Sequence, residues 1–176
     1  GVQGYNGDSI AATAAKLSGV LGVGLDGAGN LFIADTNGDR IRRVAASDGM
    51  ISTVAGTGSR GYNGDGIAAT AAQLSSPSDI VIDGLGNMYI ADKGNHRIRK
   101  VVASDGTIST VAGTGITGYN GDGMAATAAQ LNNPRYVTLD GWGNLYISDA
   151  LDAFSLDRGN IRIRKVAASN GTISTV

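Results

Sequence analysis

The sequence repeats at a fixed interval, and this repetition limits the possible folds more than any other feature of the chain. The loop GYNGDG at 61–66 occurs again 57 residues later, and the variant GYNGDS occurs 57 residues earlier. The similarity extends through DGLGNMYIADKGNHRIRKVVASDGTISTVAGTG, a segment with close counterparts beginning at Asp26 and Asp140. Nearly the whole chain is therefore three copies of one unit.

The composition favours a globular all-β fold. Hydrophobic residues make up 42% of the chain and charged residues 16%, a balance that allows a buried core. There are 28 glycines, and all 15 acidic residues are Asp, which favours turns over helices. The chain has no Cys, so it can form neither disulfides nor Cys-based zinc sites. No apolar run reaches membrane-spanning length, and the net charge of -1 argues against nucleic-acid or membrane partners.

Each unit is predicted to be a four-stranded antiparallel meander. Gly, Asn and Asp at DGLGN and ASDG suit tight hairpin turns, and apolar runs lie between them. In the middle copy the expected strands cover residues 79–83, 88–92, 97–102 and 107–112. The chain is treated as a single domain, 1–176, with units at 20–56, 77–113 and 134–176.

Both faces of these meanders are expected to be buried. In the second strand, Met88 and Ile90 point to one face, whereas Tyr89 and Ala91 point to the other. A sheet with one wet face would alternate apolar and polar residues, so each meander should lie between two others. A β-propeller provides this arrangement by radial repetition. A stacked solenoid is the competing geometry.

The middle copy resembles a known repeat family. PSDIVIDGLGNMYIADKGNHRIRKV at 77–101 is similar to an NHL repeat, with Pro before the first strand, Asp-x-x-Gly-Asn at the turn, then Tyr-Ile-Ala-Asp and Asn-His-Arg-Ile-Arg. The linker GYNGDGIAATAAQLSSP resembles the inter-blade segment of bacterial secreted and surface proteins. The resemblance implies a propeller, an extracellular or periplasmic location, and use as a binding platform or, in some members, as an enzyme.

Three units are too few to close a propeller, which typically has about four to eight blades. The resemblance implies six, so the chain corresponds to half a ring with two open apolar faces. We therefore predict a homodimer that completes a six-bladed ring. Two alternatives stay open. In the first alternative, the chain, which lacks an initiator Met, is an excerpt from a longer chain that supplies the other blades itself. In the second, head-to-tail joining of copies builds an open assembly or filament.

The repeated linker loops are the first candidate site. Each carries an Asn and an Asp whose oxygens lie close together, as a calcium or ligand site would require, although calcium takes six to eight oxygens. The alternative is a tight turn anchored by Tyr. We expect no metal and no cofactor, with calcium as the open alternative. The candidate residues are Tyr5, Asn6, Asp8, Tyr62, Asn63, Asp65, Tyr119, Asn120 and Asp122.

The remaining repeated polar residues are interpreted as structural. Asp35, Asp92 and Asp149, which end the second strand of each copy, are expected to cap the turn by accepting local backbone N–H groups rather than to act in catalysis. His96 is the only His, so a catalytic triad would depend on it alone. The basic strands, such as RIRKV at 97–101, could form an anionic-ligand surface, but Arg stems also cover apolar edges while pairing with Asp. We do not expect nucleic-acid binding.

Specific function is expected where one copy differs from the others. The third copy inserts ALDAFSLD at 150–157, and Trp142 stands in a turn where the other copies have Leu85 and Ala28. Exposed apolar groups on loops often mark contact sites, although these could instead pack internally. The candidate binding residues are Trp142, Phe154, Leu156, Asp152, Asp157, Arg135 and Tyr136.

These observations favour a non-catalytic, extracellular or periplasmic propeller module that binds a protein or glycan, or that assembles with its own kind. The alternative is a propeller-type lyase or lactonase with a metal site in the central channel. A filament subunit, or part of a longer propeller, is the third possibility.

Overall fold

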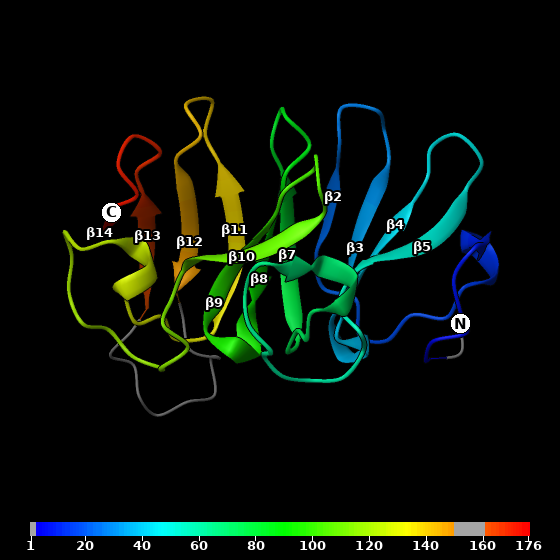
Figure 1. The fold of residues 1–176 in the computed structure, drawn as a ribbon, viewed down its shortest axis with the longest axis horizontal. Helices are drawn as coiled ribbons and strands as arrows, with labels where there is room; N and C mark the ends of the chain where they lie inside the picture. Colours follow the sequence, from blue (N-terminus) through cyan, green and yellow to red (C-terminus); the bar gives the residue numbers. More distant parts are fainter. Residues whose placement is uncertain (1–2, 150–160) are drawn as a thin grey trace.

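The computed structural model describes residues 3–149 and 161–176 and shows three antiparallel β-sheets (Figure 1). The first sheet has the order β1-β5-β4-β3-β2, the second β6-β10-β9-β8-β7 and the third β11-β12-β13-β14. The first sheet comprises β1 (Ile10–Ala11), β2 (Val23–Leu25), β3 (Leu31–Asp35), β4 (Arg40–Val44) and β5 (Met50–Ala55). The second comprises β6 (Ile67–Ala68), β7 (Pro77–Ile82), β8 (Met88–Asp92), β9 (Arg97–Val101) and β10 (Thr107–Ala112). The third comprises β11 (Pro134–Leu139), β12 (Leu145–Asp149), β13 (Arg162–Val166) and β14 (Ile173–Thr175).

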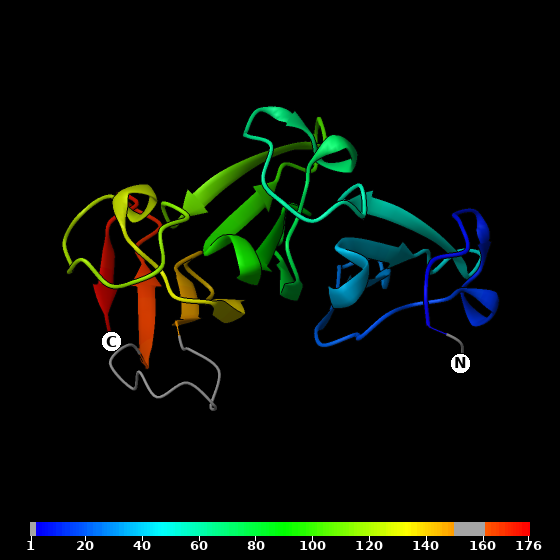
Figure 2. The same cartoon turned by 90° about the horizontal axis from the view of Figure 1, so that it is seen from below.

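The sheets are arranged in an arc, as in a propeller (Figure 2). Strands β2, β7 and β11 lie on the inner side of this arc, and the two ends of the chain lie at its opposite ends. The predicted all-β, antiparallel architecture is confirmed. The four strands expected in the middle copy coincide with β7 to β10 to within two residues.

The linkers contribute strands that the sequence did not predict. β1 pairs with β5 through Ile10 and Ile51, and β6 pairs with β10 through Ile67 and Ile108. A bridge between Ala125 and Thr172 occupies the same position beside β14. Each linker therefore extends the outer edge of the sheet that follows it. Short 3-10 turns in the described chain lie at η1 (Ala12–Ala14), η2 (Thr36–Gly38), η3 (Ala69–Ala71), η4 (Lys93–Asn95) and η5 (Ala126–Ala128).

Two apolar cores lie between neighbouring sheets, one between the first and second and one between the second and third. Met88 and Ile90 of the second sheet belong to the core shared with the first sheet, whereas Ala91 and Ile98 belong to the core shared with the third. Tyr89 packs against that second core. The prediction that both faces of the middle copy are buried is confirmed. No helix in residues 3–149 or 161–176 is long and apolar enough to cross a membrane.

Candidate functional site

The repeated loop packs against the third strand of the sheet that follows it. Arg99 of β9 is fully buried, and its Nη2 donates to the carbonyl oxygen of Gly64 at 2.9 Å and to Oδ1 of Asp65 at 2.8 Å. The centre of the Tyr62 ring lies 3.8 Å from the guanidinium carbon of Arg97 and 4.9 Å from that of Arg99. The GYNGD loop and the RIR strand are therefore two sides of one contact, which explains why they recur together.

The other two sheets repeat this contact. Arg42 donates to Asp8 at 2.8 Å, and Arg164 donates to Asp122 at 3.0 Å. The rings of Tyr5 and Tyr119 each face two arginines, within 4.9 Å of both guanidinium carbons. One arginine of each RIR strand is thus enclosed by the fold and is not part of a basic surface.

The Asn of each loop closes the loop internally. Asn63 Nδ2 donates to the carbonyl of Ala71 at 2.9 Å, and its Oδ1 accepts the N–H of Gln73 at 2.8 Å. Asn6 and Asn120 make the equivalent bonds. The oxygen of each loop Asn and one oxygen of each loop Asp, which were considered as calcium ligands, thus accept hydrogen bonds from the protein itself.

Asp92, at the end of β8, is fully buried and accepts the N–H of Ser75 at 2.8 Å. Asp35 and Asp149 accept the corresponding N–H groups of Ser18 and Asn132. These carboxylates accept backbone N–H groups as predicted, but the prediction that the donors are local to the turn is wrong, because each donor lies 17 residues earlier. Burial raises the pKa of Asp92 to about 6, against the opposing effects of its hydrogen bonds and of the Arg99 charge.

His96 is part of a junction between sheets. Its Nδ1 accepts the N–H of Asn133, at the entry to the third sheet, at 3.1 Å. Asp39 is its counterpart in the first copy, and its Oδ1 accepts the N–H of Ser76 at 2.7 Å. Both residues have a left-handed backbone, with φ of 53° and 49°. Burial, followed by the charge of Arg97, lowers the pKa of His96, so the neutral acceptor form is favoured.

The rim formed by the turns between the first two strands of each sheet carries the most exposed large apolar side chains. Trp142, between β11 and β12, is 85% exposed, and Leu85, at the same place between β7 and β8, is 84% exposed. A groove of about 510 Å³ lies between these two turns. It is lined by residues of both turns, among them Leu85, and by Val81 of β7 and Leu139 of β11. Trp142 stands on the turn that forms one wall of the groove.

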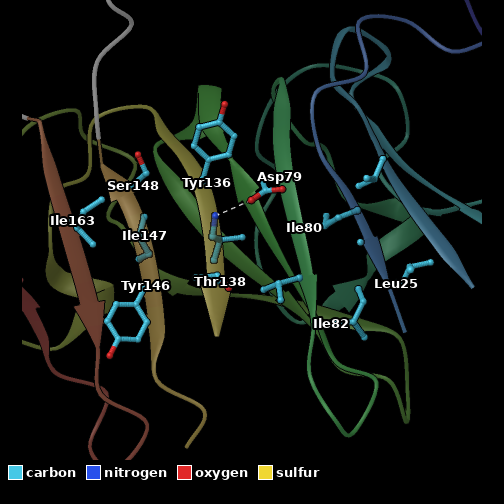
Figure 3. Close-up of a pocket in the computed structure, with 14 residues that line it drawn as sticks. Leu25, Asp79, Ile80, Ile82, Tyr136, Thr138, Tyr146, Ile147, Ser148 and Ile163 are labelled. Carbon is cyan, nitrogen blue, oxygen red and sulfur yellow. Dashed lines mark hydrogen bonds between the residues drawn. The ribbon is translucent and has the colours of Figure 1, made fainter. Parts of the chain in front are cut away.

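The inner side of the arc holds a second concavity, of about 540 Å³, lined by β2, β7, β11, β12 and β13 (Figure 3). The candidate Tyr136 lines it and is 51% exposed, and Arg135 lies beside the Tyr136 ring at 5.5 Å from its centre. Sequence reasoning missed Asp79, which also lines this cavity and accepts the N–H of Val137 at 2.9 Å. Burial raises the pKa of Asp79. A signal was available, because Asp79 stands where the other copies have Gly22 and Tyr136.

The structure thus separates the candidate residues of the third copy. Trp142 lies on the rim, whereas Tyr136 lines the cavity on the inner side of the arc and Arg135 lies beside the Tyr136 ring. Phe154, Leu156, Asp152 and Asp157 lie outside the described residues. Within the described part of the chain, no group of three or more His, Cys, Asp or Glu side chains is placed to hold a metal ion.

Comparisons with known proteins connect this geometry to a family. Residues 74–101 match the NHL repeat. The chain is 36% identical to teneurin-3 of Danio rerio over 98 residues, which are 48% of this chain and 4% of that protein. It is 30% identical to human NHL repeat-containing protein 2 over 127 residues, which are 68% of this chain and 17% of that protein. The chain therefore spans a small part of these relatives.

Solved structures share the fold. A nutrient-binding protein of Bacteroides ovatus has a TM-score of 0.65 at 23% identity, covering 93% of this chain and 39% of that one. A gluconolactonase of Xanthomonas campestris has a TM-score of 0.63 at 14% identity, covering 91% and 48%. A nidogen/laminin complex contains a chain with a TM-score of 0.60 at 19% identity, covering 89% and 47%. Together with the repeat match, these findings support the NHL-repeat propeller family.

Proposed function

We propose that this chain is a non-catalytic NHL-repeat propeller module of an extracellular or periplasmic protein, which binds a protein partner through its rim. The observation that carries the proposal is the pair of exposed apolar side chains, Trp142 and Leu85, on adjacent turns beside one groove. Large apolar and aromatic groups next to a recess act as anchors in protein interfaces. A glycan ligand is the other class that an exposed indole suits.

Two further observations support a scaffold. The repeated loops and RIR strands engage one another, so their polar groups maintain the sheets. The similar proteins include a chain from a nidogen/laminin complex, which is itself a protein assembly. We further propose that additional sheets extend the arc to a six-bladed ring of the type that the NHL-repeat resemblance implies.

Binding is tested on an array of extracellular matrix proteins, laminin included, together with a glycan array. We expect binding to a protein, weakened about tenfold or more by Trp142→Ala and less by Leu85→Ala. Both changes introduce the residue that the first copy carries naturally, Ala28, so the turn should keep its shape. Ile116→Ala, at an exposed position of a linker, is the matched control and should bind as the wild type does.

Equal binding by the wild type and Trp142→Ala on every probe would refute the rim as the binding site. Binding to glycans alone would replace the protein partner by a carbohydrate.

The alternative function is that of a propeller-type lactonase or lyase. It is favoured by Asp79, whose raised pKa and position in the inner cavity suit a proton-transfer role, and by the fold shared with a gluconolactonase. Hydrolysis of gluconolactone by the wild type, with or without added calcium, tests it. Turnover that Asp79→Asn abolishes would establish the enzyme and displace the scaffold.

A further inference from the structure

The two end sheets of the arc each present an apolar face whose counterparts are buried elsewhere in the chain. On the first sheet, Val23 of β2 is 59% exposed. Its counterparts in the next two copies, Ile80 and Val137, are 3% and 5% exposed because the preceding sheet packs on them. Leu25 of the same strand is 64% exposed.

The third sheet shows the complementary difference. Ile163 of β13 is 47% exposed, whereas its counterparts Ile41 and Ile98 are fully buried against the following sheet. Val176 at the chain end is 72% exposed, whereas its counterpart Val111 packs in the second core. The exposed residues of the third sheet thus correspond to those that, in the other two sheets, contact the following sheet. The exposed Val23 of the first sheet corresponds to residues that, in the other two sheets, contact the preceding sheet.

We propose that a second copy of this chain covers both faces, with the third sheet of each copy packed on the first sheet of the other. This inference rests on the propeller scaffold proposed above and names one of its partners. Both faces that such a junction requires are present on one chain, so two copies related by a twofold axis leave neither exposed.

The closing junction differs chemically from the two internal junctions. Asp39 accepts the N–H of Ser76 at the first internal junction, and His96 accepts that of Asn133 at the second. In the third copy the corresponding residue is Ile161, which has no side-chain acceptor. At the second junction the Ser78 hydroxyl also donates to the carbonyl of Arg135 at 2.7 Å. At this position the closing junction therefore lacks the acceptor that both internal junctions have, and the contact relies on the two apolar faces.

The experiment is sedimentation equilibrium of the 176-residue chain over a range of concentrations, with four proteins compared. We expect the wild type to have twice the mass of the chain. Ile163→Asp and Val23→Asp should each raise the dissociation constant about 100-fold or more, because the closed junction would bury an unpaired carboxylate. Both positions are about half exposed in the single chain, so the variants should fold, as circular dichroism would verify. Ile116→Asp makes the same change at an exposed position outside both faces and should leave the mass unchanged.

A monomeric wild type at every concentration would overturn the proposal. A dimer that both face variants leave intact would place the contact on another surface, and continued growth to large species would show open, head-to-tail joining instead of a ring. Rim binding is read separately from the Trp142→Ala variant. A monomer that still binds its partner would remove this inference and leave the proposed function standing.

Discussion

His96 and Asp39 show how one position can serve the same structural purpose with different chemistry. Each accepts a backbone N–H of the next sheet from a left-handed backbone conformation. Protonation of His96 would convert Nδ1 from an acceptor into a donor facing the N–H of Asn133. The second internal junction should therefore be sensitive to acid.

For His96 we expect a loss of stability on acidification. Its folded pKa is lowered below the usual 6.5, so the unfolded chain binds more protons as the pH falls through 6.5 toward the folded value. The stabilising contribution is complete above pH 6.5 and declines below it. His96→Asn keeps an oxygen acceptor, tolerates the left-handed backbone and does not titrate. Urea unfolding of both proteins between pH 5 and 7.5 measures their free energies of unfolding. As the pH falls, the wild type should lose stability relative to His96→Asn. A constant difference would contradict the assignment.

Asp92 should titrate near pH 6, observable as the carboxyl carbon shift in NMR. Because burial raises the folded pKa above the ordinary Asp value of 3.8, the folded state holds the proton more tightly than the unfolded chain. Its contribution to stability is therefore largest below pH 3.8 and decreases as the pH rises to about 6. A midpoint at or below the ordinary Asp value would mean that the hydrogen bonds and Arg99 outweigh burial.

At the scale of the elements, the loop and strand of each copy act as a pair. Strand positions and the two apolar faces could be predicted, because alternation and turn residues are local signals. Strand β6 could not, because two residues carry no periodicity. The contact between Asp65 and Arg99 joins residues 34 positions apart, so no local sequence pattern predicts it. The joint recurrence of GYNGD and RIR in all three copies was the available signal.

Asp65→Ala tests this pair. It removes the nearer of the two carboxylates paired with the buried Arg99, the other being Asp92, and the acceptor of the Thr110 hydroxyl, which donates to Asp65 at 3.1 Å. We expect the free energy of unfolding to fall by about 2 kcal/mol, since Asp65 itself is partly exposed. Asp48→Ala, in an exposed turn where Asp48 accepts only the N–H of Met50 among the bonds described, should cost about 1 kcal/mol or less. Equal losses in urea denaturation would show that the loop contact adds nothing specific.

At the scale of the whole molecule, stability should depend on protein concentration. If association covers the faces that carry Val23 and Ile163, mass action favours the folded dimer, and the melting temperature rises as the concentration increases. Ile163→Asp should remove most of that dependence, whereas Ile116→Asp should preserve it. Differential scanning calorimetry over a concentration range of about 50-fold compares the three proteins. A wild-type melting temperature that does not change would contradict association through these faces.

The linker strands have a consequence for how such a chain can grow. Because β1 and β6 join the sheets that follow them, all strands of a sheet come from one continuous stretch that starts at its own loop. Duplication or loss of one such stretch leaves every hydrogen-bonded sheet intact and changes only the number of sheets that pack face to face. Neighbouring copies of the gene segment can thus multiply without any strand being exchanged, and contacts between separate molecules need only side chains.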